Sequence, residues 1–281
     1  MTNESPALYV VPTPIGHLGD ITRRAIDLLR DVPWVAAEDT RHSGPMLREI
    51  GCRARLLAAN QHNVDGAARQ IIGKLRDGEA VALVVDAGTP GISDPGARLV
   101  AQVRAAGFRV VPLPGACAAI AALSAAGIGD AHFLFYGFLP AKAGPRDAVL
   151  RELATLPYAL IFYEAPHRIV DTVAALLKVC DAARTVVLAR ELTKLFETIH
   201  SCPLGEMPGW LAADVNRQRG EFVLIVAGAS ADADEQEGRR VLKLLLDDGL
   251  PPSQACRLAQ AITGVGKNAL YRQALDWQSA S

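Results

Sequence analysis

The sequence lacks any apolar run long enough to cross a membrane, and its first residues, MTNESPALYVV, lack the layout of a signal peptide. Its five cysteines form no CxxC pair and no metal-ligand spacing with histidine, so we expect neither a disulfide framework nor a metal site. A formal net charge of −1 argues against broad electrostatic binding to naked nucleic acid. A local basic patch, or a ribonucleoprotein target, stays compatible with it. These absences predict a cytoplasmic protein with reduced thiols.

Several common catalytic motifs are also missing. No GxGxxG follows the first predicted strand, no GxSxG occurs, and no cysteine has an obvious histidine partner. The fragment GVGKN near the C-terminus is not a phosphate loop, because the GxxxxGK[ST] pattern is incomplete and no strand precedes it. The sequence therefore does not support the usual dinucleotide, hydrolase or phosphate-loop chemistry.

The most informative stretch is VALVVDAGTPGISDPG, at residues 81–96. Its valine-rich start is typical of a strand buried on both faces. A loop dense in Gly, Pro, Asp, Thr and Ser follows, and a helix is predicted over residues 97–106. Glycines allow close backbone approach and prolines stiffen the chain. Because α/β proteins bind ligands at the carboxyl ends of their strands, this loop predicts a binding site, although an ordinary strand-to-helix turn is the alternative.

Strands and helices alternate along most of the chain. Strand patterns occur at residues 7–11, 34–37, 55–59, 81–85 and 109–112, which predicts a mainly parallel sheet. The helix before Gly127 has almost no polar face and is expected to be buried. Alternation resumes from residue 133 to 227, which predicts a second α/β domain. We place the first domain at residues 1–117 and the second at residues 118–229.

The last fifty or so residues have another character. Segment 228–234, GASADAD, has the composition of a linker, and short helices are predicted at 235–246, 253–262 and 267–275, the second capped by Ser253. Two helices joined by a tight glycine-containing turn resemble a helix-turn-helix. Residues 230–281 are therefore expected to form a small helical extension.

Polar residues stand where several predicted strands end. They are Glu38, Asp39, Asp86, Glu164, Arg190 and Glu191. In parallel sheets such ends face one crevice, and two α/β domains in contact form a cleft that suits a small-molecule cofactor.

Eight motifs follow one another from about residue 8 to residue 275: PTPIGxLGDIT, AAEDTRH, DAGTPGISDPG, PLPGxCAAIxALSAAG, GFLPAK, LIFYExPHR, ARELTKxxET and GVGKNALY. With them the chain resembles the bacterial small-subunit ribosomal RNA cytidine 2′-O-methyltransferases of the tetrapyrrole methylase superfamily. The resemblance implies a two-domain, class III methyltransferase α/β fold, a homodimer, and S-adenosylmethionine as methyl donor. It also implies a cytidine of 16S ribosomal RNA in the decoding centre of the small subunit as substrate, with no membrane or DNA partner. His17 replaces the asparagine common in the family, so no specific amide contact is implied there.

The resemblance also assigns site residues. Backbone groups of the glycine-rich loop, a facing wall and side chains of the second domain would hold the donor. In that order they are Asp86, Ala87, Gly88 and Ile92; Leu113, Pro114, Gly115 and Ala118; and Phe162, Tyr163 and Leu192. The PTPIG and GFLPAK motifs would line the substrate trough through Pro12, Thr13, Gly16, Lys142 and Arg146.

Methyl transfer to a ribose hydroxyl is an in-line displacement that a nearby base or cation assists. The candidates are Glu38, Asp39, Arg41, Glu164, His167, Glu191 and Lys194. We select Asp39, Arg41 and Glu164. The structural alternatives are an ion pair at a strand end for the first group, a helix-start role for His167, and a local salt bridge between Glu191 and Lys194.

Several basic residues are candidates for RNA phosphate contacts, with solvated surface charge as the alternative for each. They are Lys142, Arg146, Arg217, Arg219, Lys267 and Arg272. The aromatic run FLFYGF is more typical of a core than of a base-stacking platform. Two other interpretations stay open: a methylase of tetrapyrroles or other small molecules, and a non-catalytic ribosome-assembly module.

Overall fold

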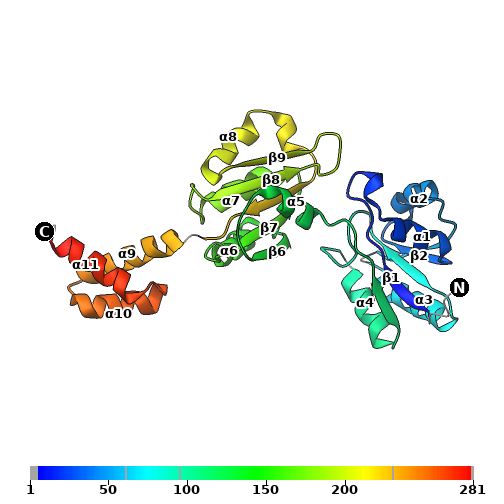
Figure 1. Ribbon diagram of the computed structural model, residues 1–281, viewed down its shortest axis with the longest axis horizontal. Helices are drawn as coiled ribbons and strands as arrows, with labels where there is room; N and C mark the ends of the chain where they lie inside the picture. The colour runs from blue at the N-terminus through cyan, green and yellow to red at the C-terminus, as the bar shows by residue number, and fades with distance from the viewer. Residues whose placement is uncertain (1–5, 61, 95, 230, 280–281) are drawn as a thin grey trace.

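The computed structural model describes residues 6–60, 62–94, 96–229 and 231–279. Figure 1 shows two α/β bodies, with the N-terminus in one of them, and a bundle of helices at the C-terminal end of the molecule. This arrangement confirms the predicted fold class.

The first sheet is entirely parallel, as predicted. Its strands are β1 (Ala7–Val10), β2 (Trp34–Ala37), β3 (Arg55–Ala58), β4 (Val81–Val84) and β5 (Arg109–Pro112), in the order β3-β2-β4-β1-β5. The helices α1 (Arg23–Asp31) and α2 (Thr40–Glu49) cover one face, and α3 (Val64–Arg76) and α4 (Gly96–Ala105) cover the other. Successive side chains of β4 enter these two cores in turn, which explains its unbroken apolar run.

The second sheet is mixed. Its strands are β6 (Phe133–Phe138), β7 (Ala159–Glu164), β8 (Thr185–Arg190), β9 (Thr198–Pro203) and β10 (Phe222–Val226), in the order β6-β7-β10-β8-β9. The pair β6–β7 is parallel, and β10 and β9 pair antiparallel with their neighbours. The helices α6 (Ala143–Leu153), α7 (Ile169–Leu177) and α8 (Met207–Ala212) cover one face, and α5 (Ala118–Ala126) covers the other.

Two features of the second domain differ from expectation. Strand β9 is additional, and as an edge strand its residues alternate between exposed and half-buried, a weaker signal than an apolar run. The prediction that α5 is buried on all sides is wrong. Its Ala119, Ala122 and Ala126 pack on the sheet, but Ile120 on its outer side is 50% exposed.

The helix boundaries follow local chemistry. The Thr22 hydroxyl accepts a hydrogen bond from the amide of Ala25 at 3.2 Å, which confirms it as the cap of α1. Gly51 follows α2 with a φ of 82°, a conformation in which glycine carries little steric cost. Ser253 is not a cap, because Pro252 already occupies the first turn of its helix, where a missing amide hydrogen does no harm.

Three helices form the C-terminal bundle: α9 (Ala231–Asp247), α10 (Pro252–Thr263) and α11 (Lys267–Ser279). Their core contains Leu242, Cys256, Ala259 and Leu270, and Gly264 makes the turn between α10 and α11 with a φ of 76°. Most of the predicted linker is therefore helical from residue 231, while residue 230 lies outside the described residues. None of the described helices is both long and apolar enough to cross a membrane.

Candidate active site

A cavity of about 520 Å³ lies between the two α/β domains. The loop after β4 forms one wall, and the ends of β7 and β8 with the start of β10 form the other. A cavity of about 660 Å³ opens at the other end of the second sheet, around Thr185 and Ala227, and contains none of the predicted site residues. Since the strand-end polar residues gather at the interdomain cavity, we take it as the candidate active site.

Hydrogen bonds from three sides hold the glycine-rich loop rigid. Thr13 and Gly88 exchange backbone hydrogen bonds of 2.9 and 3.0 Å, and the buried Thr13 hydroxyl donates to the carbonyl of Val85. The Thr89 hydroxyl donates to the carbonyl of Ala116 at 2.7 Å, and the Asp94 carboxylate accepts from two loop amides at 2.7 and 2.8 Å. Gly88 has a φ of 86°, where a side chain would be strained. The loop therefore presents preformed backbone groups to the cavity.

The first domain brings several carboxylates to this wall. Glu38, Asp86 and Asp94 line the cavity, and the amide of Asp39 donates to Asp86 at 3.3 Å. Burial, followed by the negative charge of Asp86, raises the pKa of Glu38. Asp39 differs, because it caps α2 and forms a 2.8 Å ion pair with Arg41 that lowers its pKa. Of these two neighbours, Glu38 accepts a proton more readily.

The carboxylate of Glu164 in the second domain is enclosed. It is buried, forms a 3.2 Å ion pair with Arg168 and accepts a 2.6 Å hydrogen bond from Thr172. Arg168 in turn donates to the carbonyl of Leu139 in the GFLPAK motif. Glu164 thereby ties β7, α7 and the substrate motif together. Next to it, Tyr163 lines the cavity, and burial raises the pKa of its hydroxyl, which keeps it neutral.

The connection between β8 and β9 reaches across to the first domain. Glu191 and Thr193 have φ values of 52° and 64°, which cost energy for residues with a side chain, most of all for a β-branched one. Between them Leu192 lines the cavity. The amide of His17 donates to the Thr193 hydroxyl at 3.0 Å. A Cβ on Gly16 would lie 2.6 Å from Lys194 and 2.9 Å from the Leu192 carbonyl, so the two domains meet tightly here.

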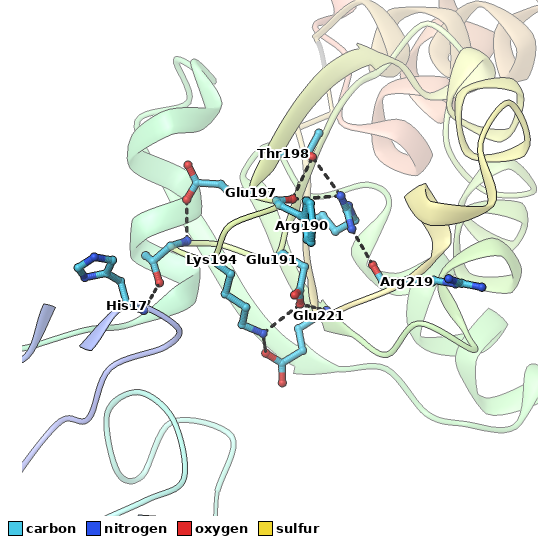
Figure 2. A network of polar contacts seen from close by, with 10 residues as sticks. His17, Arg190, Glu191, Lys194, Glu197, Thr198, Arg219 and Glu221 are labelled. Atoms are coloured by element: carbon cyan, nitrogen blue, oxygen red, sulfur yellow. Dashed lines mark hydrogen bonds and ion pairs between the residues drawn. The ribbon is translucent and has the colours of Figure 1, made fainter. Parts of the chain in front are cut away.

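A network of ion pairs and hydrogen bonds stabilises the connection between β8 and β9. Lys194 binds Glu191 at 3.0 Å and Glu221 at 2.8 Å, and Glu197 accepts from the amide of Thr193 at 2.6 Å (Figure 2). A strained backbone is kept only where surrounding contacts hold it in place. These ion pairs and hydrogen bonds hold the backbone of Glu191 and Thr193. The imidazole of His17 accepts from the amide of Gly19 and so supports the first loop itself.

The structure brings most of the predicted donor residues together. Those that line the cavity are Asp86, Ala87, Gly88, Ile92, Ala118, Tyr163 and Leu192. Leu113 and Phe162 are buried in the domain cores instead, because alternate residues of a strand point to opposite faces. Pro114 and Gly115 also lie outside the lining. A Cβ on Gly115 would lie 2.5 Å from Pro12, so this glycine joins the substrate motif to the facing wall.

The predicted RNA contacts are scattered over the molecule. Lys142 is exposed at the start of α6, whereas Arg146 is 6% exposed, contrary to the expectation of a surface charge. Arg217 lies over the ring of Trp210 at 4.6 Å, and its neighbour Arg219 is exposed. Lys267 and Arg272 are exposed on α11, remote from the cavity, and His167 is exposed after β7.

Sequence reasoning missed several residues of the cavity. They are Ile15, Thr89, Asp94, Cys117, Phe138 and Glu221. The pattern Gly-Ile-Ser-Asp-Pro-Gly was a usable signal for Asp94, since aspartate side chains commonly bond to nearby backbone amides in turns. No local signal marks Glu221, which reaches the cavity through the pairing of β10 with β7 and β8.

The residues present suit a positively charged sulfonium donor. The cavity falls within the range of about 300–1,000 Å³ typical of small-molecule sites. Glu38 and Asp86 offer negative charge, and the loop offers backbone groups. The described residues contain no group of three or more His, Cys, Asp or Glu that could hold a metal ion.

The chain is similar to two known protein families. The sequence model of the tetrapyrrole (corrin/porphyrin) methylase family matches residues 7–208, and the sequence model of the RsmI C-terminal HTH domain matches residues 232–278. A protein of Escherichia coli O157:H7 named ribosomal RNA small subunit methyltransferase I is 50% identical over 98% of this chain and 97% of its own length. The protein of that name from Pseudomonas aeruginosa PAO1 is 52% identical over 98% of both chains.

Solved structures show the same fold at lower identity. The methyltransferase CobJ superposes with a TM-score of 0.61 at 21% identity, covering 80% of this chain and 95% of its own. A uroporphyrin-III C-methyltransferase from Thermus thermophilus, complexed with S-adenosylhomocysteine, superposes with a TM-score of 0.55 at 18% identity, covering 79% and 97%. At these identities the likeness concerns the fold alone.

Proposed function

The chain belongs to the tetrapyrrole methylase family, and from this premise we propose that it transfers a methyl group from S-adenosylmethionine to small-subunit ribosomal RNA. One observation carries the proposal. The chain is about half identical, over nearly its whole length, to proteins named ribosomal RNA small subunit methyltransferase I. The finer proposal is that the acceptor is the 2′-hydroxyl of a cytidine in the decoding centre, and that the enzyme acts as a homodimer.

The geometry of the interdomain cavity supports this proposal. The glycine-rich loop is held rigid by Thr13, Thr89 and Asp94, so its backbone groups need no reorganisation to bind a donor. Glu38 and Asp86 offer negative charge to a cation. Tyr163 and Leu192 offer apolar surface from the other domain for a flat ring.

When bound, S-adenosylmethionine supplies an electrophilic methyl group on a sulfonium. In the transfer the carbon–sulfur bond breaks as the carbon–oxygen bond forms, and the hydroxyl proton must go to a base or to water. Glu38 faces the cavity with a raised pKa, so we assign it the proton-accepting role ahead of the neighbouring Asp39 and the enclosed Glu164. Arg41 stays a candidate for orienting a phosphate through its exposed guanidinium.

The test is a transfer assay on small subunits isolated from cells that lack the modification. Purified protein and donor with a labelled methyl group are incubated with these subunits, and the modified nucleoside is identified by mass spectrometry. Uroporphyrin III serves as the competing small-molecule acceptor. We expect label on one cytidine ribose and none on the tetrapyrrole.

Other results would overturn the proposal in distinct ways. Label on a base rather than a ribose would reject the 2′-hydroxyl. Label on the tetrapyrrole alone would favour a small-molecule methylase, and donor binding without transfer to either acceptor would favour an assembly module.

A further inference from the structure

The connection between β8 and β9 ends in two exposed apolar side chains. Leu195 is 90% exposed and Phe196 is 68% exposed, the highest values among the large apolar side chains of the described residues. Water-exposed apolar groups next to each other commonly mark a binding surface. Their position matters, because Leu192, only a few residues earlier, lines the candidate active site.

Hydrogen bonds hold the backbone of this tip in place. Arg190 donates to the carbonyl of Phe196 at 3.0 Å, and the amide of Glu197 donates to the carbonyl of Lys194 at 3.1 Å. The Glu197 carboxylate closes the turn on the amide of Thr193 (Figure 2). The two apolar side chains therefore extend from a fixed turn, and little backbone ordering is needed when they bind.

The same arginine joins a second segment to this turn. The Arg190 guanidinium also donates to the backbone carbonyl of Arg219 at 3.2 Å, so the segments that carry Phe196 and Arg219 lie side by side. The side chain of Arg219 is exposed, bonds to Asn216 at 3.4 Å and forms no ion pair with the described carboxylates. Two residues later Glu221 lines the cavity, so both segments lead from its wall to this surface.

We propose that Leu195, Phe196 and Arg219 form a nucleotide-stacking site beside the active site, for an unpaired RNA nucleotide that flanks the methylated one. The inference rests on the proposed function. Aromatic side chains stack on unpaired bases, a nearby arginine binds phosphate, and unpaired nucleotides are the ones that a protein can splay out of a strand. The exposed Arg219 on the neighbouring segment favours RNA over an apolar protein surface, because its positive charge complements phosphate.

The test compares Phe196→Ala and Phe196→Trp with the matched control Phe133→Ala. Phe133 is 48% exposed at the opposite end of β6 from the cavity-lining Phe138. We measure the KM for small subunits, the Kd for donor by calorimetry, and the molar mass by light scattering. Phe196→Ala is expected to raise the KM by about 5- to 100-fold, with donor Kd and mass unchanged. Phe196→Trp keeps an aromatic ring and should have the wild-type KM. The control Phe133→Ala should also have the wild-type KM. Arg219→Gln raises the KM as well and lowers its dependence on salt.

Three outcomes would overturn the inference. A wild-type KM for Phe196→Ala removes the stacking role. A weaker donor affinity in that variant makes the residue structural, and a lower molar mass assigns the surface to a second copy of the chain. Failure of the proposed function is seen separately, since the wild-type protein would then transfer no methyl group to small subunits.

Discussion

The carboxylates on the two sides of the cavity differ in their surroundings. On the first domain, Glu38 and Asp86 lie close together, and burial with like charge raises the pKa of Glu38. On the second domain, Glu164 is paired with Arg168, and Glu191 and Glu221 share Lys194. Carboxylates that repel one another are ready to meet a cationic ligand, whereas neutralised ones hold architecture. We therefore assign the proposed chemistry to the wall from the first domain and structural support to the wall from the second domain.

The largest expected effect is on the buried pair of the second domain. Glu164→Gln removes the carboxylate partner of Arg168, whose side chain is 17% exposed, and leaves an uncharged amide in its buried place, which should lower the free energy of unfolding by ~3 kcal/mol, the low end for a broken buried pair. Urea denaturation measures it. A variant of full stability that has lost turnover would break the comparison, because Glu164 would then belong to the chemistry.

The seam between the two walls comes next. Gly16→Ala places a methyl group against Lys194, Thr193 and the Leu192 carbonyl, which pushes the walls apart. Since a misplacement of ~1 Å can cost ~100-fold in rate, we expect a loss of that order in kcat for methyl transfer. The matched control is Gly73→Ala, which has open space in α3 and should keep the rate and gain up to ~1 kcal/mol of stability. Equal behaviour of both variants would show that the seam does not position the site.

Removing the charge of Glu38 and of its neighbour Asp39 should change the Tm at pH 7 in opposite directions. A raised pKa means that the folded state holds the Glu38 proton more tightly, so ionised Glu38 destabilises the fold above its ordinary pKa of 4.5. Glu38→Gln should therefore raise the Tm at pH 7, and the gain should shrink toward pH 4.5. Asp39 has a lowered pKa and stabilises the fold above its ordinary 3.8, so Asp39→Asn should lower the Tm equally at pH 7 and pH 5. Calorimetric scans at these pH values decide, and equal signs would contradict the assignment.

The smallest effect is expected at the exposed pair of the second wall. The Glu221 side chain is 77% exposed, so Glu221→Gln should cost under ~1 kcal/mol. The same urea titration sharpens the contrast with Glu164. If Glu221→Gln lowered the free energy of unfolding as much as Glu164→Gln, the Lys194 network would support this wall as strongly as the Glu164 pair does.

Sequence reasoning located one wall of the site far better than the other. The glycine-rich loop was visible because Gly88 and Gly91 carry positive φ values that glycine itself signals. In the facing turn the resemblance named Leu192, but the backbone conformation was not predicted, because Glu191 and Thr193 adopt the same region of φ without glycine. Their conformation depends on bonds to Glu197 and Glu221, which no local pattern encodes.

Local periodicity and turn chemistry were enough to predict the alternation of elements, the parallel first sheet, the cap of α1, the α/β class of the second domain and the glycine-rich loop after β4. The surroundings of the charged residues came from tertiary packing alone. Packing buried Arg146, enclosed Glu164, left Glu38 facing the cavity, and joined the backbone segments of Phe196 and Arg219 through the Arg190 guanidinium. The physical reason is that a charge takes its role from its neighbours, and the neighbours of these residues come from distant parts of the chain.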